Sequence, residues 1–322
     1  MPLLHEVAAV MCCEDIELPV LSVVIPACNE ASHIGQALRS LLDQDYPKLE
    51  VVVINDRSTD DTGEILERLA DRDNRIKVIH IDKLPAGWLG KVHALHQGVK
   101  QATGEWYLFT DADIYFQPGA LRRSVCYAKH YRLNHLACVP DVHNKGFWLD
   151  IAVRSFFLML CLGARVAEVN RENSNRPIGI GAFNLVEAAT FHNTPGFEWL
   201  RMETVDDYGL GVMIKQAGGR TRLVVALKDM SVPWYENLGA MIKGVEKNTF
   251  GAAAKYSLAR LFLIELFLLG LVMAPLVSLI SGLIFNDPLL LMVACVFFAA
   301  LVVFALYSPR QHHREMLAYL WC

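Results

Sequence analysis

The chain has 322 residues, of which 53% are hydrophobic and 20% charged, and its formal net charge is −4. So much apolar surface must be buried somewhere, which excludes a disordered chain. The slightly acidic balance excludes a strongly basic nucleic-acid binder, so we expect no nucleic-acid partner. At about 150 residues per domain, the length predicts roughly two units.

Short apolar runs alternate with helical patterns through the first third of the chain. Apolar residues recur at helical spacing over 34–42 and 65–69, and 91–102 is also typical of a helix. Strands that alternate with helices of this length form βαβ units, which build a parallel sheet covered on both faces. The predicted strands are 21–25, 51–54, 76–81 and 106–110.

The pattern is less regular beyond Gln117. Residues 136–140 predict one more strand. Residues 147–169 are rich in Trp, Phe, Leu and Met with charges at wide intervals, which predicts either an amphipathic helix on a bilayer surface or a core helix. The apolar residues after position 209 predict a helix that ends at Gly218.

Polar residues gather where the predicted strands end. Asn29 and Glu30 follow the first strand, Asp56 follows the second, and Asp111 and Asp113 follow the fourth. In open α/β sheets, ligands bind at the carboxyl ends of the strands, near the switch in strand order. These residues therefore predict one shared site.

Asp111 and Asp113 are the strongest candidates for metal binding. Two carboxylates at a strand end can share one divalent cation, and oxygen ligands suit Mg²⁺ or Mn²⁺, which commonly bridge a diphosphate. An Asp-x-Asp pattern alone is weak, because surface pairs of aspartates are common. Its position after a buried strand strengthens the interpretation.

Three other features each have a functional and a structural interpretation. Asp56 could accept hydrogen bonds from a nucleobase or ribose, whereas the residues from Ser58 onward could simply cap a helix. Lys91 begins a predicted helix and could neutralise a phosphate. The adjacent Asp206 and Asp207 could cap a helix, or one of them could act as a general base.

Two glycine patterns exclude other nucleotide-binding classes. The run that ends in Gly90 and Lys91 lacks the Ser or Thr of a P-loop, because Val92 follows. The segment from Gly179 to Asn184 lacks the third glycine of a dinucleotide fingerprint. A nicotinamide- or flavin-dependent oxidoreductase is therefore disfavoured.

Five motifs occur in order between Leu21 and Gly219: VVIPACNE at 23–30, VINDRSTDDT at 53–62, GKxxALxxG at 90–98, FTDAD at 109–113 and VDDYxLG at 205–211. Together they resemble the motifs of the family 2 glycosyltransferases. One further run, from Leu84 to Lys91, is similar to the branch that contains hopanoid-associated and carotenoid glycosyltransferases, to which the membrane-bound ceramide glucosyltransferases are related.

The resemblance implies an α/β fold of the GT-A type, with a mostly parallel sheet and helices on both faces, and a nucleotide-diphosphate sugar as donor. It implies that Asp113 is the principal ligand of a divalent metal, Mg²⁺ or Mn²⁺, with Asp111 beside it. The residues that it assigns to the nucleotide sugar are Pro26, Ala27, Glu30, Asp56, Ser58, Lys91 and Asp111.

On the acceptor side, the resemblance implies that Asp207 is the catalytic base. Asp206 replaces the Glu of the family's Glu-Asp pair, and the segment 179–184 resembles the acceptor-side Gly-x-Gly-x-Phe. Many membrane-bound members carry Gln/Arg-x-x-Arg-Trp before the membrane segment, and this chain does not. Lys247 is the candidate there to steady the leaving diphosphate, and its alternative is a basic interfacial helix.

Two long apolar runs near the end of the chain predict a transmembrane hairpin. Residues 261–285 carry one charge, Glu265, and 289–307 carry none; about 20 apolar residues cross a bilayer. Basic residues flank the pair at Arg260 and Arg310, which predicts an integral protein of a bacterial-type inner or plasma membrane with its catalytic domain in the cytoplasm. A buried hairpin in a soluble protein is the alternative.

These observations predict five segments and one activity. The segments are an N-terminal extension at 1–20, a GT-A domain at 21–235, a basic interfacial segment at 236–260, two transmembrane helices at 261–307 and a tail at 308–322. The expected activity is inverting sugar transfer to a hydroxyl of a membrane lipid or isoprenoid-type acceptor. The alternatives are a nucleotidyltransferase acting on a sugar phosphate and a non-catalytic, membrane-anchored sugar-nucleotide-binding protein, and the oligomeric state is left open.

Overall fold

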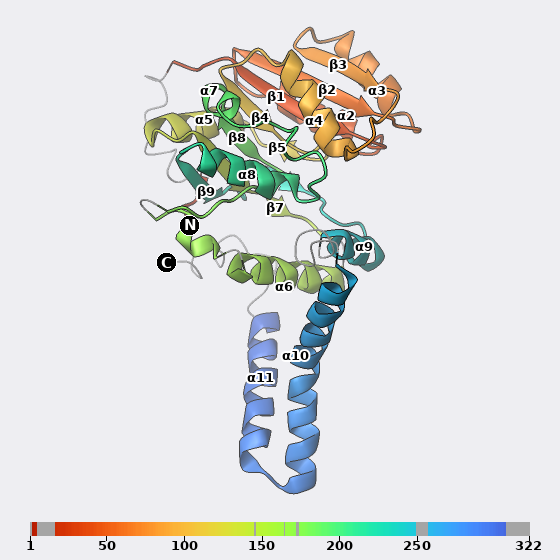
Figure 1. Cartoon of the computed structure of the whole chain (residues 1–322), viewed down its shortest axis with the longest axis vertical. Helices are drawn as coiled ribbons and strands as arrows, with labels where there is room; N and C mark the ends of the chain where they lie inside the picture. The colour runs from red at the N-terminus through yellow and green to blue at the C-terminus, as the bar shows by residue number, and fades with distance from the viewer. Residues whose placement is uncertain are drawn as a thin grey trace. The chain divides into compact units, whose positions relative to one another are not determined.

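A computed structural model describes residues 2–4, 17–144, 146–163, 165–171, 174–248 and 257–306. The chain divides into two compact units, with the division between Asn237 and Leu238 (Figure 1).

The first unit is built on a seven-stranded sheet with the order β3-β2-β1-β4-β8-β6-β9. β8 runs antiparallel to both of its neighbours, and the other pairs are parallel. The predicted strands are confirmed, with ends shifted by up to two residues. The strands are β1 (Leu21–Ala27), β2 (Leu49–Asp56), β3 (Ile76–Ile81), β4 (Trp106–Phe109), β6 (His135–Val139), β8 (Asn184–Glu187) and β9 (Thr221–Val225).

Helices cover both faces of this sheet, as the βαβ pattern predicts. Successive residues of a strand point to opposite faces, and Val23 and Val24 of β1 accordingly belong to two different clusters of buried side chains. One face is covered by α2 (Ile34–Leu42), α3 (Thr62–Ala70) and α5 (Ala120–His130), and the other by α4 (Gly90–Gln101), α7 (Ala188–His192) and α8 (Asp206–Gln216).

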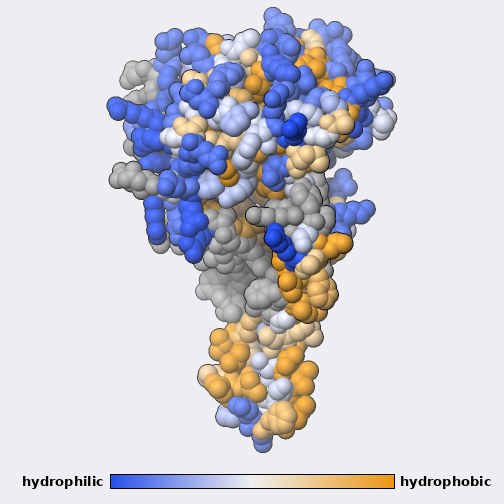
Figure 2. All heavy atoms as spheres, in the orientation of Figure 1, coloured by the Kyte–Doolittle hydropathy of each residue, from blue (hydrophilic) through white to orange (hydrophobic). Residues whose placement is uncertain are grey.

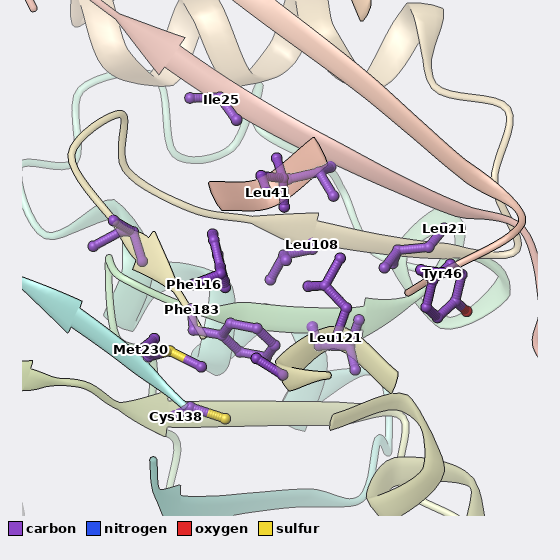
Figure 3. Close-up of a cluster of buried hydrophobic side chains, with 14 of the residues drawn as sticks. Leu21, Ile25, Leu41, Tyr46, Leu108, Phe116, Leu121, Cys138, Phe183 and Met230 are labelled. Carbon is purple, nitrogen blue, oxygen red and sulfur yellow. The ribbon is translucent and has the colours of Figure 1, made fainter. Parts of the chain in front are cut away.

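The core of the first face lies around β4 and β8. Figure 3 shows Leu108 of β4, Leu121 of α5 and Phe183 just before β8 in one cluster. Leu108 and Phe183 are fully buried. The same core includes Phe116 and Met230 from a second, three-stranded sheet of β5 (Tyr115–Phe116), β10 (Met230–Val232) and β7 (Asp141–Val142).

The helix predicted over 147–169 is shorter in the structure. It forms α6 (Phe147–Gly163) and is followed by the separate 3₁₀ helix η2 (Val166–Glu168). Cys161 packs against Leu223 of β9, so α6 contributes to the core. Phe147 and Trp148 at its start are exposed, and both are large apolar side chains.

The second unit contains α9 (Leu238–Asn248), α10 (Leu258–Phe285) and α11 (Pro288–Leu306). α10 ends at Asn286, which adopts a left-handed φ of 54°. Asp287 then accepts a hydrogen bond from the backbone N–H of Leu289 at 2.8 Å, which caps α11. α10 and α11 pack against each other, and a Cβ at Gly282 would lie 2.9 Å from Leu291 Cγ.

Apolar side chains cover much of the exposed surface of α10 and α11 (Figure 2). Nevertheless, among the residues that the structure describes, none of the helices has both the length and the apolar character needed to cross a membrane. The side chain of Glu265 and the whole of Arg310 lie outside the described residues.

Replacing Leu108 with Ala is expected to lower the free energy of unfolding by about 2–5 kcal/mol, because the change leaves a cavity in a close-packed core. Leu108→Met, which keeps the volume, should cost less than about 1.5 kcal/mol. Urea unfolding of the full chain, followed by circular dichroism, measures both. Equal stability of the Ala variant and the wild type would contradict the described core.

Candidate active site

A cleft opens at the carboxyl ends of the central strands. The strand order reverses between β1 and β4, because the chain builds β2 and β3 on one side of β1 before it forms β4 on the other. This is the position at which open α/β sheets bind ligands. The polar lining comes from the end of β4, the first turn of α4, the segment before β8 and the start of α8: Lys91, Thr110, Asp111, Asn184, Asp206 and Asp207.

Lys91 forms ion pairs with carboxylates that are far apart in the sequence. Its Nζ lies 2.7 Å from Asp111 Oδ1 and 3.6 Å from Asp206 Oδ2. Burial alone would lower the pKa of Lys91, but Asp111, Asp206 and Asp207 together raise it above its ordinary value. Lys91 therefore remains positively charged in the cleft at any physiological pH.

Asp207 lies in the first turn of α8, and its Oδ1 accepts a hydrogen bond from the backbone N–H of Tyr208 at 2.8 Å. Burial and the neighbouring charge of Asp206 raise the pKa of Asp207 to about 6, although Lys91 opposes the shift. A carboxylate with such a pKa is mostly ionised at neutral pH and binds a proton more readily than an ordinary aspartate.

Two glycines allow the segment before β8 to approach α8. A Cβ at Gly179 would lie 1.7 Å from the carbonyl oxygen of Asp207, and one at Gly211 would lie 2.0 Å from the carbonyl oxygen of Ile178. No side chain fits at either position. The predicted acceptor-side segment thus lies directly against the helix that carries Asp207, and this packing role of the glycines was not evident from the sequence.

Glu30 and Asp113 form a second acidic group near Asp111. Burial, then the charges of Asp113, Asp111 and Asp60, raises the pKa of Glu30 to about 7. Burial and Asp111 likewise raise the pKa of Asp113 to about 6. Burial is the larger cause of both shifts, and repulsion among the three carboxylates adds to it.

His33 is a further member of this group that the sequence did not point to. Its positive form lowers the pKa of Asp113, and its Nδ1 lies 2.9 Å from the hydroxyl of Tyr115, which fixes the ring. The only signal in the sequence is its position three residues after Glu30. The structure explains the spacing, because the start of α2 packs against β5 and brings His33 to Tyr115.

The acidic group suits a divalent cation that takes one or two ligands from the protein and the others from a substrate. Among the described residues, no group of three or more His, Cys, Asp or Glu side chains is placed to hold a metal ion. Mg²⁺ and similar ions in nucleotide sites take one or two carboxylates and complete their shell with phosphate oxygens and water. Asp113 and Asp111 provide such a partial donor set, and a cation would relieve the repulsion that raises the pKa of Asp113.

Asp56 lies at the end of β2 and is almost fully buried. It accepts two hydrogen bonds from Arg57, from Nε at 2.7 Å and from Nη2 at 2.8 Å. Gly90 allows α4 to begin directly against this pair, because a Cβ there would lie 2.4 Å from Asp56 Oδ2. Asp56 and Lys91 are therefore brought to the same part of the sheet edge.

The loop after β1 is held by the loop after β2. The backbone N–H of Asn29 donates to Ser58 Oγ at 3.0 Å, and that of Glu30 donates to Thr62 Oγ1 at 2.8 Å. Within the predicted capping run 58–61, Ser58 therefore supports the neighbouring loop and does not cap α3. Asp60 instead accepts from the backbone N–H of Thr62 at 3.1 Å.

The remaining predicted residues occupy two different places. Pro26 lines the cleft, and Ala27 is buried at the end of β1. Lys247 belongs to the second unit, and its side chain lies outside the described residues, so its role stays a prediction.

The sequence profile of glycosyl transferase family 2 matches residues 22–208, and the chain belongs to this family. The 4,4'-diaponeurosporenoate glycosyltransferase of Staphylococcus aureus strain USA300 is 29% identical over 197 residues, which are 59% of this chain and 50% of the relative. The chain thus spans about half the length of the curated relatives that it matches.

Solved structures show the same fold. The mannosyltransferase PcManGT from Pyrobaculum calidifontis, in complex with GDP-Man and Mn²⁺, has a TM-score of 0.56 at 22% identity and covers 94% of this chain and 85% of its own. GalNAc-T7 with UDP, GalNAc and Mn²⁺ has a TM-score of 0.51 at 16% identity, covering 69% of this chain and 44% of its own. The predicted α/β GT-A fold with a mostly parallel sheet is confirmed.

Glu30→Gln is expected to stabilise the protein at pH 8 in EDTA by about 1–2 kcal/mol, after allowance for screening. The folded-state pKa of Glu30, about 7, exceeds its ordinary value of 4.5, so ionisation costs stability as the pH rises through this window. At pH 4 the side chain is protonated in both states, and the gain should vanish. Urea unfolding at both pH values measures the difference; a gain that does not depend on pH would contradict the repulsion.

Proposed function

We propose that this chain is an inverting glycosyltransferase that moves a sugar from a nucleotide-diphosphate sugar to a hydroxyl of a membrane lipid or isoprenoid-type acceptor. The observation that carries the proposal is the contact of Lys91 with Asp111 and Asp206 beside Asp207. It combines a fixed positive charge with a carboxylate of raised pKa in one cleft. Membership of the family supports sugar transfer as the reaction.

Charged residues near the strand ends support a nucleotide-diphosphate sugar as the donor. Asp56 and Glu30 present carboxylates to a nucleoside, and Lys91 presents a cation to the diphosphate or the donor sugar. Two structures that share the fold contain GDP-Man and UDP. They support a nucleoside diphosphate as the common part of the donor.

In the proposed reaction, Asp207 removes the proton from the acceptor hydroxyl while the oxygen attacks the anomeric carbon. The bond from that carbon to the diphosphate breaks, and the nucleoside diphosphate leaves with the electron pair. Lys91 favours the ionised form of Asp207, whereas the charge of Asp206 makes Asp207 a stronger base. One displacement inverts the anomeric carbon, so an α-linked donor yields a β product.

A divalent metal is proposed at Asp113, with Asp111 beside it. When bound, Mg²⁺ or Mn²⁺ supplies positive charge that stabilises the departing diphosphate. The two structures that share the fold contain Mn²⁺. Lys91 pairs with Asp111 at 2.7 Å and so fixes that carboxylate in the cleft.

We further propose that α10 and α11 anchor the chain in a membrane. Residues 261–307 contain one charged side chain before the Asn286–Pro288 turn and one within it. Exposed apolar patches of this extent on a soluble surface mark contact with a membrane or another protein. The relative from Staphylococcus aureus is named as a glycosyltransferase of 4,4'-diaponeurosporenoate, and this supports an isoprenoid-type acceptor.

Asp207→Asn should lower kcat by about 10²–10⁴-fold, because the amide accepts no proton. In the wild type, kcat should rise with pH through about 6, where Asp207 ionises. Lys91→Gln should move this limb to higher pH, because Lys91 lowers the pKa of Asp207. Measurement of kcat across about pH 5–8 with a saturating sugar nucleotide tests all three expectations. An unchanged kcat in Asp207→Asn would refute the assignment.

Mn²⁺ with GDP or UDP is expected to raise the melting temperature, and more at pH 8 than at pH 5, because protons compete for Asp113 near its pKa of about 6. Asp113→Asn should remove the Mn²⁺-dependent part of the shift. Asp71→Asn, an exposed position on the surface, serves as the control. An equal shift in all three proteins would argue against a metal at Asp113.

A screen of isotope-labelled sugar nucleotides with total membrane lipid as acceptor should yield a glycolipid, identified by mass spectrometry. The full chain should also stay in membranes after alkaline carbonate extraction, because its apolar hairpin is held by lipid. Transfer to water-soluble acceptors alone would contradict the lipid acceptor. Binding of a sugar nucleotide without transfer would favour the non-catalytic alternative.

A further inference from the structure

A second concave site lies between α2 and α3, on the face of the sheet opposite α4. Its volume is about 250 Å³, and it shares no lining residue with the cleft that contains Lys91. Three arginines line it: Arg39 from α2, Arg68 from α3, and Arg72 from the turn that follows α3. We call this site the arginine groove.

The groove follows from how the two helices pack. α2 and α3 lie side by side (Figure 1), and Gly35 of α2 faces Ile65 of α3. The apolar sides of both helices are buried toward the sheet, so charged side chains occupy the outer side. Arg68 in the last turn of α3 and Arg72 in the turn after it both line the groove.

The positive charges of the groove are poorly compensated. Arg68 has one carboxylate nearby, that of Glu64 at 3.6 Å, and both side chains are mostly exposed, which makes a weak pair. Among the described residues, neither Arg39 nor Arg72 forms an ion pair. Arg75, three residues further on, instead donates to Asp73 Oδ2 at 2.7 Å and to the carbonyl oxygen of Leu42 at 3.0 Å.

Guanidinium groups match the geometry of phosphate oxygens, and several of them around one hollow favour a doubly charged anion. The polar lining adds the amide of Gln36 and the hydroxyl of Ser32, while Ile65 and Leu69 supply an apolar part. The volume is below the range of drug-sized pockets, about 300–1,000 Å³. It suits a phosphate group with a short organic portion.

From these observations we propose that the arginine groove binds a phosphate monoester, distinct from the donor diphosphate in the cleft. The arginines hold the phosphate, and Ile65 and Leu69 contact the carbon atoms beside it. The source of the phosphate is either a small soluble metabolite or a lipid headgroup, and both present the same monoester chemistry to Arg39, Arg68 and Arg72.

Isothermal titration of the full chain in detergent and EDTA tests the proposal, with glycerol 3-phosphate and short-chain phosphatidic acid as separate probes. EDTA keeps divalent metal out of the cleft. The wild type should bind at least one probe saturably, and the double variant Arg39→Gln/Arg72→Gln should bind it at least about tenfold more weakly, because two charge-assisted contacts are lost. Circular dichroism verifies that the variant is folded.

The matched control is Arg132→Gln/Arg220→Gln, which removes the same charge at exposed positions outside the groove. It should retain the wild-type affinity. Binding of phosphatidic acid alone would support a lipid headgroup, and binding of glycerol 3-phosphate would support a soluble ligand. No saturable binding of either probe, or an equal loss in both double variants, would overturn the proposal.

Discussion

The ammonium group of Lys91 is the centre on which the site depends. It lies 2.7 Å from Asp111 at the end of β4 and 3.6 Å from Asp206 at the start of α8. Without a positive charge here, carboxylates from these two elements would repel one another across a partly buried cleft. Because Lys91 opens α4, and α4 follows β3, one side chain links the amino-terminal half of the sheet to the helix that carries Asp207.

Small residues make this arrangement possible. Gly90 lets α4 begin against Asp56, and Gly179 and Gly211 let the segment before β8 lie against α8. Gly181 lets the same segment approach the side chains of Lys91 and Asp111. At each position an added Cβ would lie within 2.7 Å of another atom. The motifs that identify the family therefore combine charged residues that meet in the cleft with glycines that allow the backbone to reach it.

The molecule carries an acidic site and a basic one. In the cleft, burial raises the pKa of Glu30 and Asp113, and repulsion among Glu30, Asp111 and Asp113 adds to the shift. A bound cation would relieve that repulsion. In the arginine groove three arginines gather, and among the described residues only Arg68 forms an ion pair, a weak one with Glu64. The two sites share no lining residue, and their opposite charge predicts different ligands.

The sequence by itself determined strands β1 to β4 and β6, the helices between the first four, and the positions of Asp56, Asp111 and Asp113 at strand ends, because hydrophobic periodicity and strand-end chemistry are local properties. It also determined the family through motifs in a fixed order. Only the tertiary structure decided that β8 inserts antiparallel between β4 and β6, that Ser58 supports a loop, and that His33 approaches Asp113. The physical reason is that these contacts join segments far apart in the chain, and their partners follow from packing that no local pattern encodes.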